Sequence, residues 1–411
     1  MFKVLLMLCA LGAVLLAQET DVLFWSTKTP APTPGRCQIQ AHGNVRDTIY
    51  ICGGRTASAI VTRIVQAYVP GTNSWVSTLP SMPGPRSHGC GDVIDSIIYA
   101  AGGFDSSGAV QATLYAFYVN SKTWATLAPM PSPGILCAGA AYGGRFYVFG
   151  KQNNSDTLFE YVPGTNTWNT RVPATRPQGR RAAAAAGTAN YFYVMGGLNA
   201  AGTALQDCWR FTRMTGGAWT QMADMPGSRV MHAAYTAVGD SVIYVVGGNP
   251  TNMGAACDSI VYKYSIALNI WTTETPMPTS RGFLTLDRAQ DKIYAICGIN
   301  GAVYYTTNEE GGPVVGGIEE NQNKTGRIAL TVQPNPINRY CSITYYLDKK
   351  AAVSLEVYNS CGELIEKLVN KSQDCGIHAV KFDRYQLPDG AYFVRLTVDN
   401  ASAGCKLLMI R

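Results

Sequence analysis

Charged residues are scarce in this sequence. Only 15% of its 411 residues are Asp, Glu, Lys or Arg, and the formal net charge is +6. The cations form neither a run nor a stripe interleaved with aromatic residues, so nucleic acid is not expected as a partner. A composition this poor in charge also disfavours long helices with a charged face.

Signatures of metal and catalytic sites are missing as well. The sequence contains no CxxC, no histidine pair at ligand spacing and no Asp-rich loop, so no metal or other cofactor is expected. We also find no G-x-S-x-G elbow, phosphate-binding loop or acid/base pair. His42, His88 and His232 lie near the starts of predicted strands, where packing is favoured over catalysis. No residue is therefore assigned a catalytic role.

A long apolar run occurs only at the N-terminus. Residues 1–17 (MFKVLLMLCALGAVLLA) place one cation, Lys3, before an unbroken apolar stretch, as a secretory signal peptide does. This segment is shorter than a membrane-spanning helix, and no later segment is long and apolar enough to be one. We therefore expect an exported chain without a transmembrane segment in its mature form.

Glycine, proline and tyrosine are abundant, with 42, 21 and 23 copies. These residues favour turns and half-buried strands, so an all-β protein is expected. A strand that ends in glycine recurs about every fifty residues, which is the spacing of a repeat architecture. The six copies begin at Tyr50, Tyr99, Tyr147, Tyr193, Tyr244 and Tyr294.

A tryptophan series runs in step with these strands, at Trp75, Trp124, Trp168, Trp219 and Trp271. Together with the double glycine and a Met-Pro element, the pattern resembles kelch repeats over residues 21–310. The resemblance implies a β-propeller in which each repeat forms one four-stranded blade around a central channel. We predict six blades within residues 18–310.

The sixth repeat lacks its tryptophan, and the N-terminus supplies a candidate for the missing strand. Trp25 lies one repeat length before Trp75 and is likewise followed by a Pro-rich stretch. We expect the N-terminal strand to complete the last blade, because closure removes an open sheet edge.

Two nearly identical octapeptides mark one turn of the repeat, YVPGTNSW at residues 68–75 and YVPGTNTW at 161–168. Each is expected to join the third strand of a blade to the fourth. A type II turn is predicted, with proline at the first central position and glycine, at positive φ, at the second.

The character of the sequence changes after Glu310. Residues 311–326 are rich in glycine and polar residues and are expected to form a linker. From 327 to 411 short alternating strands return, as in a small immunoglobulin-like β-sandwich.

The order of motifs in this last segment resembles the C-terminal sorting domain of the type IX secretion system. The matching residues are Pro334, Asn335, Pro336, Gly362, Gly390 and Tyr392. The resemblance implies the type IX secretion machinery as a partner and a secreted or cell-surface location. An accessory immunoglobulin-like module without a sorting role is the alternative.

Export makes disulfide bonds permissible, and eleven cysteines follow the signal segment. Equivalent positions in the repeats suggest two candidate pairs, Cys52–Cys297 and Cys208–Cys257. The alternative is that these small side chains simply fill tight inner strands.

An arginine ends the Pro-rich stretch of most repeats, at Arg36, Arg86, Arg181, Arg229 and Arg281, while the third blade has Gly134 there. Because these residues start equivalent strands, they are expected to approach one mouth of the channel. Their guanidinium groups are candidates to bind carboxylates or acidic sugars. The alternative is that each caps backbone carbonyl groups of the scaffold.

The leading hypothesis is an exported binding propeller without catalysis of its own, whose ligand is a protein or a glycan. The resemblance also implies a rival, because some six-bladed kelch proteins isomerise sialic acids. An isomerase needs a polar acid/base cluster in the channel, so that cluster discriminates between the two functions.

Overall fold

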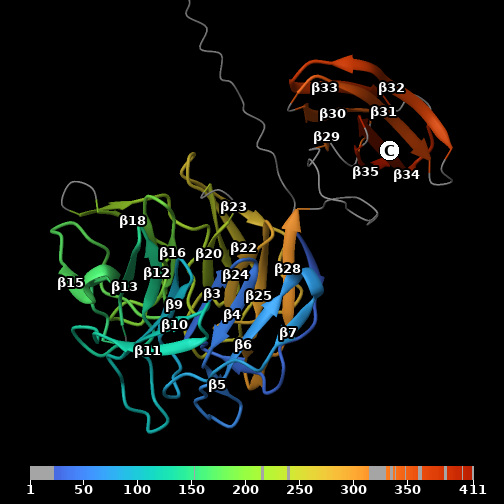
Figure 1. The fold of residues 1–411 in the computed structure, drawn as a ribbon. Coiled ribbons are helices and arrows are strands. Elements are labelled where there is room, and N and C mark those ends of the chain that lie inside the picture. The colour runs from blue at the N-terminus through green and yellow to red at the C-terminus, as the bar shows by residue number, and fades with distance from the viewer. Residues whose placement is uncertain are drawn as a thin grey trace, which may run out of the picture. The chain divides into compact units, whose positions relative to one another are not determined.

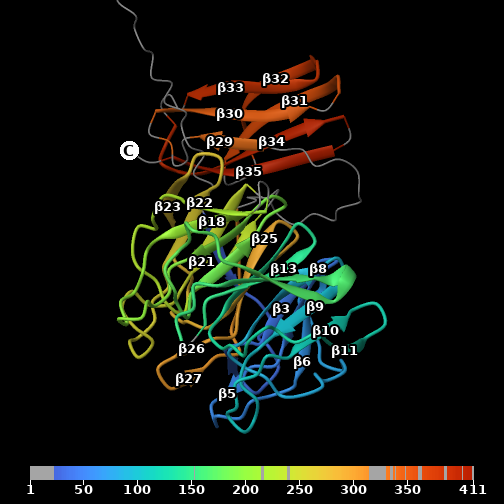
Figure 2. The ribbon, with the colours of Figure 1, turned by 90° about the vertical axis from the view of Figure 1, so that its left-hand side faces the viewer.

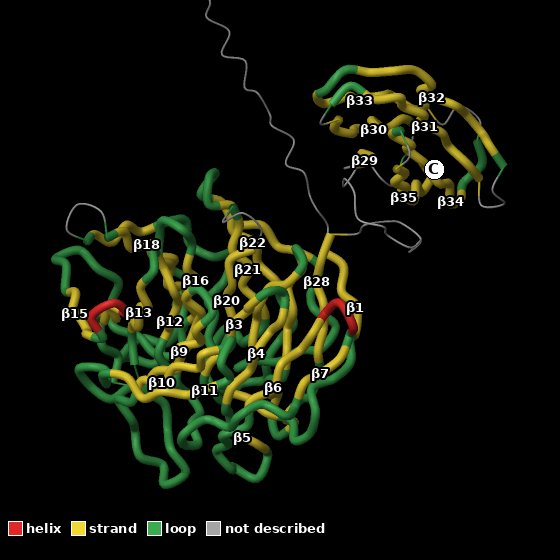
Figure 3. Tube along the Cα trace, viewed as in Figure 1, coloured by secondary structure: helices red, strands yellow, loops and turns green. Residues whose placement is uncertain are grey.

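The computed structural model describes residues 23–313 except 152, 214–216 and 238–240, and residues 330–409 except 334–336, 338, 348, 360–362, 384–386 and 400. It divides into two compact units, Met1–Pro313 and Val314–Arg411. The predicted signal peptide lies outside the described residues, as does the predicted linker beyond Pro313. Throughout the described ranges the chain is all-β, and its only helical turns are 3₁₀ turns η1 (Pro70–Thr72) and η2 (Pro163–Thr165) (Figure 3).

Six four-stranded antiparallel sheets make up the described part of the first unit (Figures 1 and 2). We number them in chain order of their innermost strand. The first three are β3 (Ala41–Val45), β4 (Thr48–Cys52), β6 (Val65–Val69) and β7 (Ser74–Val76); β8 (Cys90–Ile94), β9 (Ile97–Ala101), β10 (Leu114–Tyr118) and β11 (Thr123–Leu127); and β12 (Ala138–Tyr142), β13 (Arg145–Phe149), β14 (Leu158–Val162) and β15 (Thr167–Arg171).

The fourth to sixth sheets follow the same plan. They are β16 (Ala184–Gly187), β17 (Phe192–Met195), β18 (Cys208–Thr212) and β19 (Ala218–Gln221); β20 (Ala233–Ala237), β21 (Val242–Val246), β22 (Val261–Ser265) and β23 (Ile270–Glu274); and β24 (Thr285–Ala289), β25 (Lys292–Ile296), β28 (Asn308–Pro313) and β1 (Leu23–Thr27). Two short ribbons pair β2 (Arg36–Cys37) with β5 (Arg55–Thr56) and β26 (Ile299–Asn300) with β27 (Val303–Tyr304).

The innermost strands form a closed circle. Each of β3, β8, β12, β16, β20 and β24 contacts the innermost strand of the next sheet, and β24 contacts β3 again. The N-terminal strand β1 pairs antiparallel with β28 from Leu23 opposite Pro313 to Thr27 opposite Glu309 (Figure 1, blue beside orange). The expected completion of the last sheet by the N-terminal strand is therefore present.

The repeated tryptophans join neighbouring sheets. The indole N–H of Trp75 donates to the carbonyl of Thr29 at 2.9 Å, and that of Trp124 donates to Pro80 at 3.0 Å. Trp25, Trp168 and Trp271 make the same bond to the segment that leaves the preceding sheet. The tryptophan series is therefore part of the scaffold, as its spacing indicates.

The twin octapeptides form a different turn from the predicted type II turn. Pro70 to Thr72 make one 3₁₀ turn, and Asn73 rather than Gly71 takes the left-handed conformation, with φ of 47°. The side chain of Asn73 explains the choice, because its Oδ1 accepts from both the Tyr68 hydroxyl at 2.8 Å and the Thr29 amide at 2.9 Å. The type II prediction is wrong because it gave this asparagine no role.

The second unit contains two sheets. One is built of β29 (Leu330–Gln333), β30 (Tyr340–Leu347) and β33 (Gly376–Asp383), and the other of β31 (Ala351–Asn359), β32 (Leu364–Gln373), β34 (Gly390–Val398) and β35 (Ala401–Met409) (Figure 2). Alternate residues of β31 point into one apolar core, with Val353, Leu355 and Val357 buried. This is the period-two pattern of a strand with one buried face.

Candidate binding site at the ring of loop residues

The positions predicted to carry arginine are equivalent in the fold, and the fourth of them is Arg180 where Arg181 was expected. At each position the backbone carbonyl accepts from the amide that follows the inner strand pair of the preceding sheet, at 2.7 to 3.0 Å. The six positions are Arg36, Arg86, Gly134, Arg180, Arg229 and Arg281. We expected Arg181 at the fourth position; the hydrogen bonds place Arg180 there, because the two adjacent arginines cannot be told apart by spacing alone.

The guanidinium groups at these positions lie inside the protein. Arg281 is fully buried, and its Nη1 donates to Glu309 Oε2 at 2.6 Å while Nε and Nη2 donate to the carbonyls of Cys297 and Ala295. Arg36 is buried likewise and donates to the Gly53 carbonyl at 2.7 Å and to Gln66. These groups cap backbone carbonyls, as the scaffold alternative expects.

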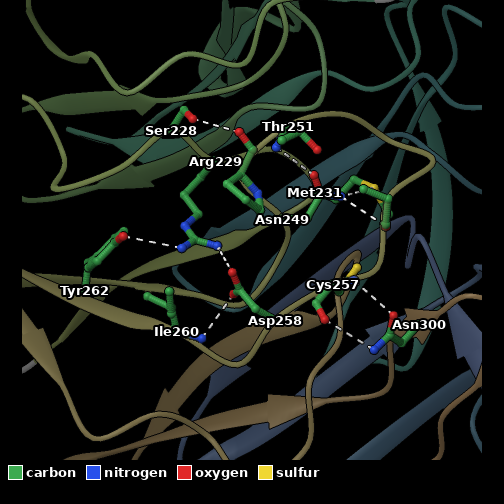
Figure 4. A network of polar contacts seen from close by, with 12 residues as sticks. Ser228, Arg229, Met231, Asn249, Thr251, Cys257, Asp258, Ile260, Tyr262 and Asn300 are labelled. Carbon is green, nitrogen blue, oxygen red and sulfur yellow. Dashed lines mark hydrogen bonds and ion pairs between the residues drawn. The ribbon is translucent and has the colours of Figure 1, made fainter.

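Figure 4 shows that the guanidinium of Arg229 is also paired inside the protein, but with side chains. Its Nη1 donates to Asp258 Oδ2 at 2.5 Å and its Nη2 to the Tyr262 hydroxyl at 3.3 Å, with the guanidinium over that ring. Asn300 bonds both the amide and the carbonyl of Cys257, which ties the loops of the fifth and sixth sheets together. The guanidinium of Arg229 is therefore paired within the protein, where it holds loops in place.

Two residues after each arginine position, the backbone forms a closed ring of six hydrogen bonds. Each amide in the ring donates to the carbonyl of the equivalent residue in the preceding sheet, at 2.6 to 3.3 Å. We call these residues the loop ring: Gln38, His88, Leu136, Ala182, Met231 and Phe283. The ring lies at the end of the circle where the innermost strands begin.

All six loop-ring residues have left-handed backbone, with φ between 46° and 62°, and none is glycine. A side chain in this conformation costs roughly 1–2 kcal/mol, which glycine would avoid. Strain kept at six equivalent positions makes the loop ring a candidate functional site. Those of Gln38, His88, Leu136 and Phe283 are only half-buried, so they reach solvent there.

Aromatic and cationic groups surround the loop ring. The His88 ring contacts Phe104 with centroids 5.1 Å apart and Phe283 at 6.3 Å. Burial and the nearby Arg55 lower the pKa of His88 to about 4, so its imidazole is neutral at pH 7. Arg55 and Arg181 are half-buried in the ribbon and bridge positions beside the ring.

These two arginines differ in their partners. Arg181 Nη1 donates to Asn154 Oδ1 at 2.9 Å. Arg55 makes no side-chain hydrogen bond or ion pair within the described residues. Asp105, the carboxylate beside Phe104, is held by its own loop, accepting from Ser107, Ala109 and Gln111. Two half-buried cations, Arg55 and Arg181, therefore flank a ring that includes the half-buried aromatic side chains of His88 and Phe283.

An acid/base cluster lies on the innermost strands. His42 Nδ1 is 3.0 Å from Asp287 Oδ2, and the Asp287 side chain is buried whereas that of His42 is 24% exposed. Burial raises the pKa of the Asp92 carboxyl to about 6, although amide donors of Ala141 and Val93 oppose the shift. The pKa of His42 is raised by Asp287 and Asp92 against the effect of burial.

Sequence reasoning missed both features for physical reasons. Asp92 and Asp287 each lie on an innermost strand, opposite the repeated tyrosine of the next strand. A carboxylate at that position of the repeat was the sequence signal that could have revealed the cluster. The loop ring depends on a left-handed φ, which its six different residue types do not predict. The sequence signal that could have revealed it is its constant spacing, two residues after each arginine position. Within the described residues, no three His, Cys, Asp or Glu side chains are grouped as metal ligands.

The predicted disulfide bonds are not formed. All four cysteines are free and buried. Cys52 packs between the first and second sheets and Cys297 between the sixth and first; Cys208 packs between the fourth and fifth, and Cys257 lies in a separate cluster with Met231. Equivalent positions thus face different interfaces, as the packing alternative expects. An unanticipated pair, Cys90 and Cys137, lies in one buried cluster, where Cys137 and burial raise the pKa of Cys90.

The sorting-motif residues are divided by the described ranges. Pro334, Asn335, Pro336 and Gly362 lie outside them. Gly390 begins β34 with φ of 155°, and the Tyr392 hydroxyl donates to the Pro388 carbonyl at 3.2 Å.

Among the helices of the described residues, none has the length and hydropathy to cross a membrane.

Comparison with known proteins assigns both parts of the chain. Residues 15–197 match the KLHDC2/KLHL20/DRC7 Kelch-repeats domain, and residues 331–410 match the secretion system C-terminal sorting domain. The chain therefore carries a kelch-repeat domain, folded as an all-β propeller, and a type IX sorting domain. The sorting domain indicates export to the cell surface or the medium through the type IX machinery.

Individual relatives agree with this assignment. Kelch-like protein 35 of Mus musculus is 27% identical over 227 residues, 54% of this chain, and Kelch-like protein 26 of Danio rerio is 26% identical over 230 residues, 52% of it. The chain spans about a third of the length of these relatives, 36% of each. The solved structure of YjhT matches with a TM-score of 0.57 and 16% identity over 68% of this chain and 95% of that one, a likeness of fold alone.

Proposed function

We propose that this chain is an exported binding protein whose propeller has six blades and takes a carboxylate-bearing ligand, on a protein or a glycan, at the loop ring. The observation that carries the proposal is the ring itself: six strained, non-glycine residues flanked by Arg55 and Arg181. Arginine forms paired hydrogen bonds with carboxylates, and the faces of His88 and Phe283 suit the apolar part of such a ligand.

Further parts of the proposal concern the domain plan. The closed circle of innermost strands supports a six-bladed propeller within residues 18–310, and the two sheets of the second unit support an immunoglobulin-like sandwich over 327–411. A signal peptide at residues 1–17 would deliver the chain to the sorting machinery, with residues 311–326 as linker.

A screen of the purified chain tests the binding function. Sialylated glycans, uronic-acid oligosaccharides and acidic peptides are presented beside neutral counterparts. The double variant Arg55→Ala/Arg181→Ala is expected to lose about tenfold or more in affinity for an acidic hit, because a hydrogen bond to a charged group contributes about 1.5–3 kcal/mol.

Arg145→Ala is the matched control for this screen. Arg145 is also half-buried, but it begins β13 and so lies at the opposite end of its sheet from Leu136. Its removal should leave the affinity unchanged. Selection of neutral ligands only, or equal loss in control and double variant, would refute the proposed site.

The cluster of His42, Asp287 and Asp92 favours a second candidate function, proton transfer on a sugar. An anomeric interconversion needs one group that donates a proton and one that removes it, and a carboxyl with pKa of about 6 beside a His–Asp pair can do both. Nuclear magnetic resonance of N-acetylneuraminic acid tests this. If the protein is an enzyme, anomer exchange should be faster than in buffer alone. The Asp92→Asn variant should then lower the rate of exchange by at least about tenfold.

A further inference from the structure

A groove on the fourth sheet differs from the corresponding places on the other sheets. It has a volume of about 510 Å³ and is open to solvent. Its wall includes three glutamines, Gln178, Gln206 and Gln221, together with Asp207, Trp209 and Ser228. The volume lies within the range of small-ligand sites.

Trp209 is the side chain that sets this groove apart. It is the second residue of the third strand, β18, and is half-buried. At the same place in the other five sheets the side chain is buried, between 1% and 9% exposed: Gln66, Tyr115, Phe159, Tyr262 and Glu309. The fourth sheet therefore half-exposes a tryptophan at a place where the other five sheets bury their side chain.

The arginine position distinguishes the fourth sheet from two of the others. In the second and fifth sheets Arg86 and Arg229 cover the tyrosine rings at 5.3 and 5.2 Å from the centroids. In the fourth sheet Arg180 instead makes two bonds to Asp207, at 2.6 and 2.8 Å. Among the described residues, no cation lies over Trp209.

Asp207 also fixes the orientation of the indole. The Trp209 N–H donates to Asp207 Oδ2 at 2.7 Å, and the same carboxylate is neutralised by the fully buried Arg180. The groove thus has an orientated aromatic ring but no uncompensated charge. A ring held in place loses little entropy when a ligand stacks on it.

The remaining wall is uncharged: it combines the three glutamines and Ser228 with the apolar side chains of Ala204 and Leu205. Gln178, Gln206 and Gln221 are all exposed, and a glutamine amide carries two donor hydrogens and an acceptor oxygen. The Gln221 amide already donates to Asp224 Oδ1 at 3.3 Å, which leaves its oxygen and second N–H hydrogen for a ligand. Such groups match the vicinal hydroxyls of a sugar, whose C–H face packs on an aromatic ring. An anion would find no free cation among the residues that line the groove, since Arg180 beside it is paired with Asp207.

We propose that this groove binds a neutral glycan, with one sugar ring on Trp209 and its hydroxyls bonded by the three glutamines. The site is separate from the loop ring and does not depend on the function proposed there. An exported propeller with both sites would hold a carboxylate at the ring and a neutral sugar at the side of the fourth blade.

Saturation-transfer nuclear magnetic resonance of the full chain tests the groove. The probes are maltose, cellobiose, lactose and N,N′-diacetylchitobiose, each at about 10 mM, which detects a Kd of about 1 mM. At least one probe is expected to bind. Trp209→Ala should abolish its signal, Trp209→Phe should retain part of it, and Gln221→Ala should weaken it about threefold to tenfold.

Controls separate this proposal from loss of fold and from the ring. Trp124→Phe removes another half-buried indole that lies outside the groove, and Arg55→Ala/Arg181→Ala removes the ring cations. Both should leave the sugar signal unchanged. If the Trp209→Ala variant does not fold, the sugar signal of Gln221→Ala decides, because Gln221 is exposed. Absence of binding by all four probes, or full binding by both Trp209→Phe and Gln221→Ala, would overturn the proposal.

Discussion

The arginine positions and the loop ring lie two residues apart in every sheet, yet they behave in opposite ways. The arginine positions repeat one residue type five times out of six and bury its guanidinium among backbone carbonyls and paired side chains. The loop ring repeats a backbone conformation but carries six different side chains, four of them reaching solvent. Within this chain, repetition of a side chain marks the scaffold, whereas variation on a repeated backbone marks the candidate for recognition.

The largest expected difference between the two sets is in stability. Arg281→Ala should lower the free energy of unfolding by about 3–5 kcal/mol, because it leaves the buried Glu309 carboxylate without its partner. Phe283→Ala, two residues later and half-buried, should cost about 1 kcal/mol. Denaturant unfolding of the two variants measures both values. Equal losses would remove the distinction between scaffold and ring.

The acid/base cluster should make stability depend on pH. The raised pKa of Asp92 means that the folded protein holds more protons than the unfolded chain between about pH 4 and pH 6, so stability falls as pH rises through that range. The raised pKa of His42 acts in the same direction above its ordinary value of 6.5.

Substitution isolates this effect from other titrating groups. Asp92→Asn should reduce the difference in melting temperature between about pH 4.5 and pH 8, and His42→Gln should reduce the part above pH 6.5. Asp105→Asn serves as control. Asp105 lies in a surface loop, and the hydrogen bond from Ser107 lowers the pKa of its carboxyl. An Asp92→Asn profile parallel to that of the parent protein would show that the cluster does not titrate as described.

The smallest expected effect concerns the strain of the loop ring. Ala182→Gly relieves the left-handed conformation, but a more flexible unfolded chain offsets the gain, so stability should change by less than about 0.5 kcal/mol. Ala184→Gly in the neighbouring strand β16 should destabilise by about 1 kcal/mol. Thermal unfolding of this pair measures the difference; a large loss for Ala182→Gly would mean that the ring is not strained.

The sequence predicts the scaffold well because each signal acts within one repeat or between neighbours. The indole of Trp75, the Pro-rich stretch after it and the strand at Tyr50 recur at one spacing. The indole hydrogen bond recurs in every sheet except the fourth, where Trp219 instead packs on phenylalanine rings. The partner strand of β28 was readable for the same reason, since Trp25 keeps the spacing.

The site was less predictable because it depends on details finer than the repeat. A shift of one residue between Arg180 and Arg181 exchanges a buried scaffold group for a half-buried one. The side chain of Asn73 decided its turn against the preference of Pro-Gly. Five of the hydrogen bonds in the loop ring join residues about fifty positions apart, and the sixth joins Gln38 to Phe283. No local sequence pattern predicts such bonds.

The central claim, that the arginine positions stabilise the fold while the ring beside them binds the ligand, is most directly tested by measuring affinity and melting temperature together on Arg55→Ala/Arg181→Ala. For the strongest acidic ligand found in the screen, affinity should fall about tenfold or more while the melting temperature stays within about 2 °C of the parent protein. Retained affinity, or a fall that comes only with unfolding, would contradict it.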